Sequence, residues 1–148
     1  MRQKILPFII GSLFLIAGVS SCSLETDGTG GMEGYWHLVK VDTLETGGSA
    51  DLSQRLFFWS FQVHLMEGVD RNNEHTTILC RFEKDGNLLR LYDARIHNPG
   101  EGDPSITDLS LLSPFGLSDT EENFTIEQSS HSKMTLSNGI LRLCFKKM

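Results

Sequence analysis

The 148-residue sequence has few cysteines and no recognisable metal-binding motif. Its three cysteines form no Cys-x-x-Cys pair, and no His-Glu-x-x-His motif occurs. Zinc sites are usually built on such paired ligands. The five histidines are scattered singly along the chain: His37, His64, His75, His97 and His131. The acidic residues over 93–108 also lack the alternating spacing of a calcium loop. We therefore expect no metal ion and no cofactor.

A catalytic set of nucleophile, base and orienting residue is missing as well. Ser130 and Lys133 match the Ser-x-x-Lys pattern that places both side chains on one helical face in β-lactamases. Here the four residues precede an expected strand, in which that geometry does not occur. No other pattern joins a nucleophile to a base, so the sequence predicts that the protein is not an enzyme.

The chain also lacks an excess of positive charge. Lys and Arg total 13 against 19 Asp and Glu, which gives a formal net charge of -6. Nucleic-acid phosphates require basic patches, so an acidic module of this kind is a poor candidate for binding DNA or RNA. We expect no nucleic-acid partner.

The N-terminal segment contains a long apolar run. Arg2 and Lys4 precede an almost wholly apolar stretch over 5–19, which is the layout of a secretory signal peptide. The run is shorter than the ~20 residues that cross a bilayer. Val-Ser-Ser-Cys at 19–22 resembles the lipobox of bacterial lipoproteins, in which the cysteine thiol is acylated and becomes the mature N-terminus. An ordinary signal peptide cleaved near Ser20 is the alternative.

These features divide the chain into three parts. Residues 1–21 form the expected lipoprotein signal peptide, and a lipidated Cys22 begins a glycine-rich, acidic tether over 22–31. Residues 32–148 have the size of one domain. The lipid would make the membrane a partner and hold the protein at the bacterial cell envelope. We expect the outer membrane, on its periplasmic or outer side; the sequence identifies no protein partner.

Two hairpins can be assigned from turn signals and alternation. Asp85-Gly86 and Asn138-Gly139 are typical of two-residue type I′ turns. The expected cross-strand pairs are Phe82–Leu89 and Cys80–Leu91 in the first hairpin, and Leu136–Leu141 and Met134–Leu143 in the second. The apolar residues then share one face on both strands. Cys80 points inward and Cys144 outward, so the two are not expected to form a disulfide.

Further runs predict strands with one apolar face each. The longest, over 56–67, has an apolar face made of Phe57, Trp59, Phe61, Val63 and Leu65. A strand over 34–42 carries apolar residues on both faces, since Val39 and Val41 oppose Trp36 and Leu38. About eight strands in total favour an all-β, antiparallel up-and-down barrel, because closure removes unpaired edges.

The connection over 94–118 is long, and loops of this length usually bind or cover something. Its second half is apolar, so we expect a plug under the barrel or an extra strand rather than a lid. Within it, residues 105–113 are expected to form a strand, with a short helix as the alternative.

Gly34 and Trp36 open the first strand of the domain as a Gly-x-Trp motif. Together with the lipobox, the short length and the closing hairpin, this motif resembles the small lipocalin-like lipoproteins of Bacteroidetes over residues 32–148. The resemblance implies a lipocalin-like, eight-stranded barrel whose tryptophan closes one end. It also implies an arginine near the last strand that packs on the indole; Arg142 has the matching position, although its register turns it outward.

An eight-stranded barrel can be filled by side chains or hold one small ligand. The inward residues are bulky, so the expected cavity is narrow. We expect a small apolar or amphipathic ligand near the mouth, in contact with Trp59, Phe61 or Met134. The alternative is a filled barrel that serves as a protein–protein interaction or structural module of the envelope.

Overall fold

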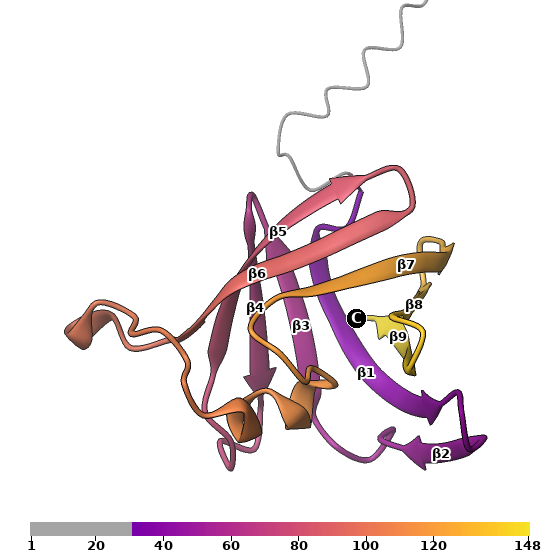
Figure 1. The fold of residues 1–148 in the computed structure, drawn as a ribbon, viewed down its shortest axis with the longest axis horizontal. Coiled ribbons are helices and arrows are strands. Elements are labelled where there is room, and N and C mark those ends of the chain that lie inside the picture. The colour runs from indigo at the N-terminus through magenta and orange to yellow at the C-terminus, as the bar shows by residue number, and fades with distance from the viewer. Residues whose placement is uncertain (1–30) are drawn as a thin grey trace, which may run out of the picture.

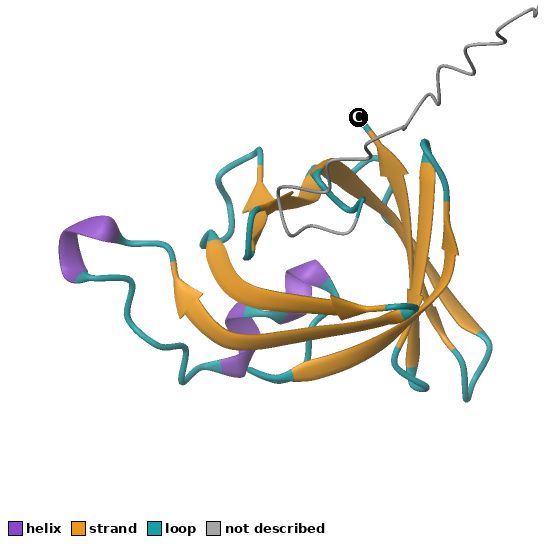
Figure 2. Ribbon diagram, turned by 90° about the horizontal axis from the view of Figure 1, so that it is seen from above, coloured by secondary structure: helices purple, strands orange, loops and turns teal. Residues whose placement is uncertain are grey.

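The protein is described by a computed structural model over residues 31–148, so the expected signal peptide, Cys22 and most of the tether lie outside the described residues. Nine strands form one antiparallel sheet in the order β2-β1-β3-β4-β5-β6-β7-β8-β9, and pairing of β1 with β9 closes it. Eight strands thus make a closed barrel, and β2 extends the edge of β1 (Figure 1, Figure 2). The predicted all-β, eight-stranded antiparallel barrel is confirmed.

All nine strands fall within residues 32–148, so this segment contains the complete barrel. The strands are β1 (Gly34–Thr43), β2 (Gly48–Asp51), β3 (Phe57–Gln62), β4 (Leu65–Asp70), β5 (Ile78–Asp85), β6 (Leu88–Ile96), β7 (Glu122–Ser129), β8 (Lys133–Ser137) and β9 (Leu141–Lys147). Three 3-10 turns lie between β6 and β7: η1 (Pro99–Glu101), η2 (Leu109–Leu111) and η3 (Ser113–Phe115). Among residues 31–148, none of the helices has the length and apolar character to cross a bilayer.

The two ends of the barrel differ, because alternate turns of an up-and-down barrel lie at the same end. The Trp36 end, as we call it, carries the start of β1, the end of β9 and the β3–β4, β5–β6 and β7–β8 turns. The mouth, as we call the opposite end, carries the end of β1, β2, the β4–β5 and β8–β9 turns and the β6–β7 connection (Figure 1).

A β-bulge in β1 explains why this strand has apolar residues on both faces. The β1–β9 register shifts between Leu38 and Lys40, which leaves Val39 as the extra residue. An extra residue moves the inward–outward alternation by one position. Trp36 and Leu38 are therefore buried before the bulge, and Val41 packs against the core after it.

The single strand predicted over 56–67 is wrong, because this segment forms the β3–β4 hairpin. Gln62 pairs with Leu65 across a two-residue turn of Val63 and His64. Val63 has φ +57°, in the left-handed region that β-branched residues rarely adopt. Val63 and Leu65 are 51% and 45% exposed instead of inward. No Gly, Asn or Pro marks the turn, so the sequence alternation continues through it.

Both predicted hairpins exist, but each turn lies one residue further along the chain. The turns are Gly86-Asn87, between Asp85 and Leu88, and Gly139-Ile140, between Asn138 and Leu141. Gly86 and Gly139, with φ of +58° and +88°, hold the first central position, and the residues after them have no positive φ. This is the glycine position of a type II′ turn, so the predicted type I′ is wrong.

The strand registers consequently differ from the prediction by two residues. Phe82 lies opposite Leu91, and Leu136 lies opposite Leu143. A shift of two keeps every side chain on its predicted face, because side chains alternate with period two. Cys80 is buried in the interior while Cys144 lies on the outer face, as predicted, and both are free thiols.

Two 3-10 turns replace the strand predicted over 105–113, so that prediction is wrong. The Asp108 carboxylate caps η2 by accepting a hydrogen bond from Ser110 N at 3.0 Å. Pro114 lies in the first turn of η3, where no intrahelical N–H is needed. Gly116 ends η3 with φ +79°. The Asp108 cap, Pro114 and Gly116 favour 3-10 turns here, although the alternating leucines resemble the pattern of a strand.

The η3 turn fills the mouth side of the barrel interior as a plug, which confirms the preference for a plug over a lid. Phe115 is fully buried: its ring centroid lies 5.8 Å from that of Phe57, and its carbonyl accepts a hydrogen bond from Trp59 Nε1 at 3.0 Å. Gly68 makes room for the ring, because a Cβ there would lie 3.1 Å from it. The other buried residues of this connection are Ile106, Leu112 and Leu117.

Candidate ligand-binding site at the barrel mouth

A pocket of about 520 Å³ opens at the mouth between the plug and the strands that face it. It is bordered by the end of β1, β2, the start of β3, the β4–β5 loop, the loop after η3 and the start of β9. Its apolar wall consists of Val41, Leu52, Phe57, Pro114, Leu117 and Leu141. Phe57 and Leu117 also belong to the buried core, so the floor of the pocket is continuous with the packed interior.

The short strand β2 builds one side of this pocket. β1 pairs with β3 as far as His37 and with β2 from Lys40 onward, so β2 continues the wall where β3 turns away. Ala50 lies opposite Val41 on β2, lines the pocket and is exposed. Its small side chain leaves the opening wide.

Polar groups lie at the rim of the pocket rather than in its floor. The Arg55 guanidinium lies over the Phe57 ring, 5.2 Å from its centroid, and 3.9 Å from the Glu74 carboxylate. His75 presents its ring edge-on to Phe57, with 5.3 Å between centroids. An apolar molecule in the pocket would therefore have a cation and an imidazole within reach of any polar group at its outer end.

The rim is held in place by the buried carboxylate of Asp70, which is 2% exposed. It accepts hydrogen bonds from Asn72 N at 2.9 Å, Glu74 N at 3.1 Å and His75 Nδ1 at 2.9 Å. Burial alone would raise the pKa of Asp70, but these three hydrogen bonds together hold it below its ordinary value. The β4–β5 loop is thus folded around one charged group.

Asp70, Glu74 and His75 bring three potential metal-ligand atoms within 4.8 Å of one another, a grouping that the sequence analysis missed. The hydrogen bonds of Asp70 and the ion pair between Glu74 and Arg55 account for the arrangement without a metal. The signal in the sequence is an Asp followed by backbone donors in a turn, which is typical of loop capping.

A second buried carboxylate fixes the loop between the plug and β7. Glu122, 8% exposed, accepts hydrogen bonds at Oε1 from Ser118 N at 2.7 Å, Ser118 Oγ at 2.5 Å and Asp119 N at 3.0 Å. Ser118 lines the pocket, so Glu122 positions part of its wall from inside the barrel.

The three ligand contacts expected from the sequence lie in the packed interior and not in the wall of this pocket. Trp59, Phe61 and Met134 are 0%, 2% and 1% exposed. The Trp59 ring lies 6.1 Å from Phe61 and 4.8 Å from Phe145, the cross-strand partner of Met134. The structure therefore groups these residues as core, whereas the pocket uses loop and strand-end residues that no periodic pattern marks.

The Gly-x-Trp motif closes the opposite end of the barrel. Trp36 is 1% exposed, and its Nε1 donates to Met32 O at 2.9 Å. Lys147 Nζ lies 5.2 Å from the indole centroid. Gly34, with φ +108°, leaves room for this lysine, since a Cβ there would lie 3.1 Å from Lys147 Cε.

The contact of Arg142 with the tryptophan, which the resemblance implied, is wrong. Arg142 lies on the outer face near the start of β9 and binds the Glu127 carboxylate, with Nε to Oε2 at 2.8 Å. Lys147, at the far end of the same strand, supplies the cation that lies on the indole.

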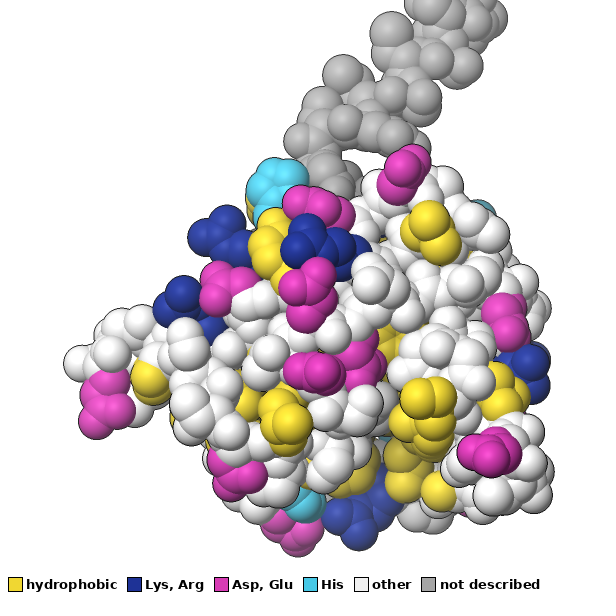
Figure 3. Space-filling model, in the orientation of Figure 1, with side chains coloured by type: hydrophobic (Ala, Val, Ile, Leu, Met, Phe, Trp, Pro, Cys, Tyr) yellow, Lys and Arg dark blue, Asp and Glu magenta, His cyan; other side chains and the backbone are white. Residues whose placement is uncertain are grey.

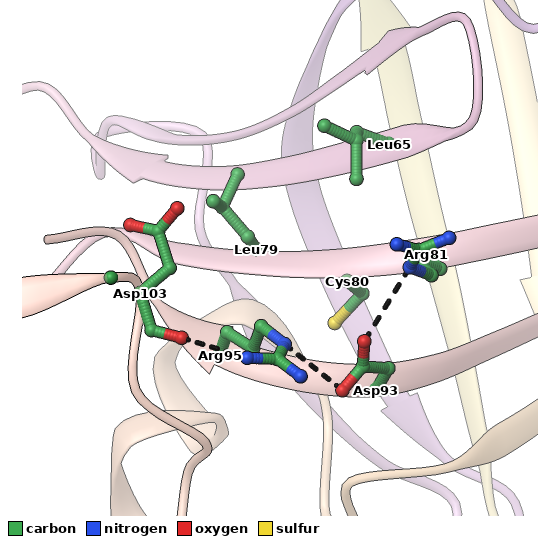
Figure 4. A pocket seen from close by; sticks show the side chains of 8 residues that line it. Leu65, Leu79, Cys80, Arg81, Asp93, Arg95 and Asp103 are labelled. Carbon is green, nitrogen blue, oxygen red and sulfur yellow. Dashed lines mark hydrogen bonds and ion pairs between the residues drawn. The ribbon is translucent and has the colours of Figure 1, made fainter. Parts of the chain in front are cut away.

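A second hollow, of about 420 Å³, lies on the outer surface of β4, β5 and β6 (Figure 4). Arg81 and Arg95 both approach Asp93, at 3.5 and 3.0 Å, and Arg95 Nη1 donates to Asp103 O at 3.1 Å. Beneath it, burial raises the pKa of the Cys80 thiol to about 12, so this thiol stays protonated at neutral pH. Because the charges in this hollow already satisfy one another, the mouth pocket is the stronger candidate site.

Comparisons with known proteins agree with the barrel. A family model described as a lipocalin-like domain matches residues 15–148. A solved lipocalin-like protein from Bacteroides uniformis ATCC 8492 is 18% identical, with a TM-score of 0.60, and the match covers 78% of this chain and 97% of that one. An uncharacterized protein from Bacteroides eggerthii DSM 20697 is also 18% identical, with a TM-score of 0.58 and coverages of 78% and 98%. No curated protein matches the chain.

Proposed function

The chain belongs to the lipocalin-like family, and from that premise we propose that it binds one small apolar or amphipathic molecule, without catalysis, in the mouth pocket. The observation that carries this proposal is the pocket itself. Its volume of about 520 Å³ falls within the range of roughly 300–1,000 Å³ typical of small-molecule sites. Its wall is apolar and its few polar groups converge at the rim, which is the usual layout of such sites.

The rim chemistry favours a ligand with an apolar body and an anionic or hydrogen-bonding end. The body would lie on Phe57, Leu117 and Leu141, and the end would lie near Arg55 and His75. Arg55 is about half exposed and its carboxylate contact with Glu74 is long, at 3.9 Å, so the guanidinium can exchange that partner for a ligand group. The buried Cys80 thiol is unsuited to attack such a ligand, in keeping with binding without reaction.

Native mass spectrometry of residues 23–148, together with titration of anilinonaphthalene sulfonate, tests this proposal. We expect a co-purifying small mass or saturable one-to-one binding of the probe. Ala50→Trp should weaken probe binding at least tenfold, because the indole would fill the pocket from exposed β2 without disturbing the core. Leu109→Trp adds the same ring to an exposed residue outside the pocket wall and should leave binding unchanged. Equal binding by wild type and Ala50→Trp would refute the assignment.

The second candidate function is an envelope interaction module with a filled barrel. The packed interior favours it, since Trp59, Phe61 and Met134 are at most 2% exposed. This reading predicts a clean apo mass, no effect of Ala50→Trp on probe binding, and capture of a specific envelope protein on the purified domain.

We further propose that the protein is a lipoprotein of the outer membrane, anchored through acylated Cys22. The apolar run, the small residues before Cys22 and the absence of a positive stop-transfer cluster in the sequence support this. Cys22→Ala should abolish incorporation of a palmitate analogue and release the protein from the membrane fraction. Cys144→Ala removes a half-buried thiol of the barrel. This variant should still incorporate the palmitate analogue and remain in the membrane fraction. Continued labelling of Cys22→Ala would contradict the anchor.

A further inference from the structure

The lysines of the barrel are concentrated at one end. Of the five lysines in residues 31–148, Lys84, Lys133, Lys146 and Lys147 lie at the Trp36 end, and Lys40 lies in the mouth half of β1. The acidic residues at the same end of the described barrel are Glu33, Glu83 and Asp85, and Glu83 pairs with Arg90 at 3.4 Å. This end therefore has a positive surplus, although the whole chain has a formal net charge of -6.

None of the four lysines at the Trp36 end forms an ion pair with an acidic residue in the described part of the chain. Lys133 and Lys146 are exposed and lie directly opposite each other on β8 and β9. Like charges in such a cross-strand pair destabilise a sheet. Elsewhere most basic side chains approach acidic ones, as the neighbouring dark-blue and magenta groups of Figure 3 illustrate, and Arg71 lies over the Tyr35 and Phe58 rings. Stability does not explain the Lys133–Lys146 pair, but binding to an anionic surface does.

Exposed apolar side chains accompany the lysines. Val63 is 51% exposed at the β3–β4 turn, Leu88 is 56% exposed at the β5–β6 turn, and Met148 is 67% exposed beside the start of β1. Val63 sits in a left-handed conformation that Asn or Gly would adopt with less strain. An apolar residue at such a position, on a turn that faces solvent, is available for contact with an apolar surface outside the barrel.

The chain also enters the barrel at this end, since β1 begins at Gly34. Gly31 lies nine positions after Cys22, and an extended chain spans at most about 3.5 Å per residue, or roughly 30 Å. An anchor at Cys22 would therefore keep the Trp36 end close to the bilayer. The charge and exposure of this end are independent of that anchor.

We propose that the Trp36 end is a docking surface for a bilayer of anionic phospholipids. Lys84, Lys133 and Lys146 bind the lipid phosphates, and the side chains of Val63, Leu88 and Met148 enter the interface between headgroups and acyl chains. Acidic residues outnumber basic ones around the mouth: Asp42, Glu45, Asp51, Glu74, Asp108 and Asp119 lie there, against Lys40, Arg55, Arg71 and Arg142. Anionic lipid repels this end, so the barrel stands with its ligand pocket facing away from the membrane.

Vesicle flotation with anchor-free residues 23–148 tests the proposal. We expect binding to phosphatidylcholine vesicles that contain phosphatidylglycerol and little binding to phosphatidylcholine alone. The triple variant Lys84→Gln, Lys133→Gln and Lys146→Gln should lower the partition coefficient about a hundredfold, since each lysine near an anionic surface contributes roughly fivefold. Lys40→Gln removes one lysine charge from the opposite half of the barrel and should have no effect.

Any one of several outcomes would overturn the docking surface. Equal binding by the triple variant and Lys40→Gln would do so, and so would absence of binding by the wild type. Full binding by Leu88→Ser together with complete competition by soluble polyphosphate would indicate a general anion site instead of a bilayer. In the anchored full-length chain, brominated lipids should quench Leu88→Trp more than Leu109→Trp at the mouth; the reverse order would also contradict the orientation. Probe binding at the mouth pocket is measured separately and does not depend on these results.

Discussion

Phe115→Ala is expected to lower the free energy of unfolding by about 3–5 kcal/mol, the range for removing a large buried aromatic side chain. The ring is fully buried, lies edge-on to Phe57, and fills the space that Gly68 leaves open on β4. The hydrogen bond from Trp59 Nε1 goes to the Phe115 carbonyl and is retained in the variant. The loss should therefore come from packing, and a cavity should open beside the Trp59 indole.

Urea unfolding followed by tryptophan fluorescence measures this change. Leu109→Ala, in the same connection but 45% exposed, should change the unfolding free energy by less than about 0.5 kcal/mol. If the plug is part of the core, Phe115→Ala should also bind small apolar probes inside the barrel, because apolar cavities accept such guests. A loss below about 1 kcal/mol would mean that the mouth side of the interior holds together without the plug.

The inward faces of the strands could be predicted because they depend on alternation alone. The two hairpin turns were assigned one residue early, yet Phe82, Leu91, Leu136 and Leu143 all lie on their predicted faces. When a turn lies one residue later than predicted, the cross-strand pairing shifts by two residues. Because side chains alternate between the two faces with period two, each side chain stays on its predicted face. The lipocalin-like resemblance rests on Gly34 and Trp36 together with the lipobox, the short length and the closing hairpin, and it is confirmed.

Three features were beyond a single-sequence argument because each breaks the alternation locally. The bulge at Val39 moves the phase of β1 by one residue, and the turn at Val63 occurs without a turn-forming residue. The η2 and η3 turns depend on the Asp108 cap and Pro114, and their leucines resemble a strand when read as a pattern.

The position of the mouth pocket could not be predicted from the sequence. The sequence predicts ligand contacts at Trp59, Phe61 or Met134, and none of these residues lines the mouth pocket. Its residues come from strand ends and loops, such as Leu52, Pro114 and Leu141, whose meeting depends on where the long connection folds back. The large aromatic Trp59 attracts attention in the sequence, but a large aromatic on an inward face is first of all a core residue.

Asp70→Asn is expected to lower the free energy of unfolding by about 3 kcal/mol at neutral pH, because it disrupts a buried network around a charge. The carboxylate accepts from two backbone N–H groups and from His75 Nδ1, using both oxygens. An amide can accept at one oxygen, and its NH2 group would face the donors of Glu74 and His75. Asp51→Asn is the matched control, since exposed Asp51 accepts one hydrogen bond from Ser53 N, and its loss should be clearly smaller.

The acid dependence gives the sharper test. The pKa of Asp70 lies below its ordinary value in the folded protein, because the hydrogen bonds outweigh the effect of burial. Its contribution to stability is therefore fully present above the unfolded pKa of about 4 and is lost as the pH falls through the lower folded pKa. The difference between wild type and Asp70→Asn in urea unfolding should shrink below about pH 4; a constant difference would mean that this carboxylate does not supply the charge-dependent term.

The same substitution also connects the network to the pocket. His75 contacts Asp70 on one side and the Phe57 ring on the other, and both His75 and Phe57 line the mouth pocket. Loss of the carboxylate should release the β4–β5 loop, so Asp70→Asn should weaken anilinonaphthalene sulfonate binding under conditions where the barrel stays folded. Asp51→Asn, on the outer edge of β2, should leave probe binding unchanged. If Asp70→Asn binds anilinonaphthalene sulfonate as tightly as the wild type, the apolar wall of the pocket is sufficient for binding and the rim network is not required.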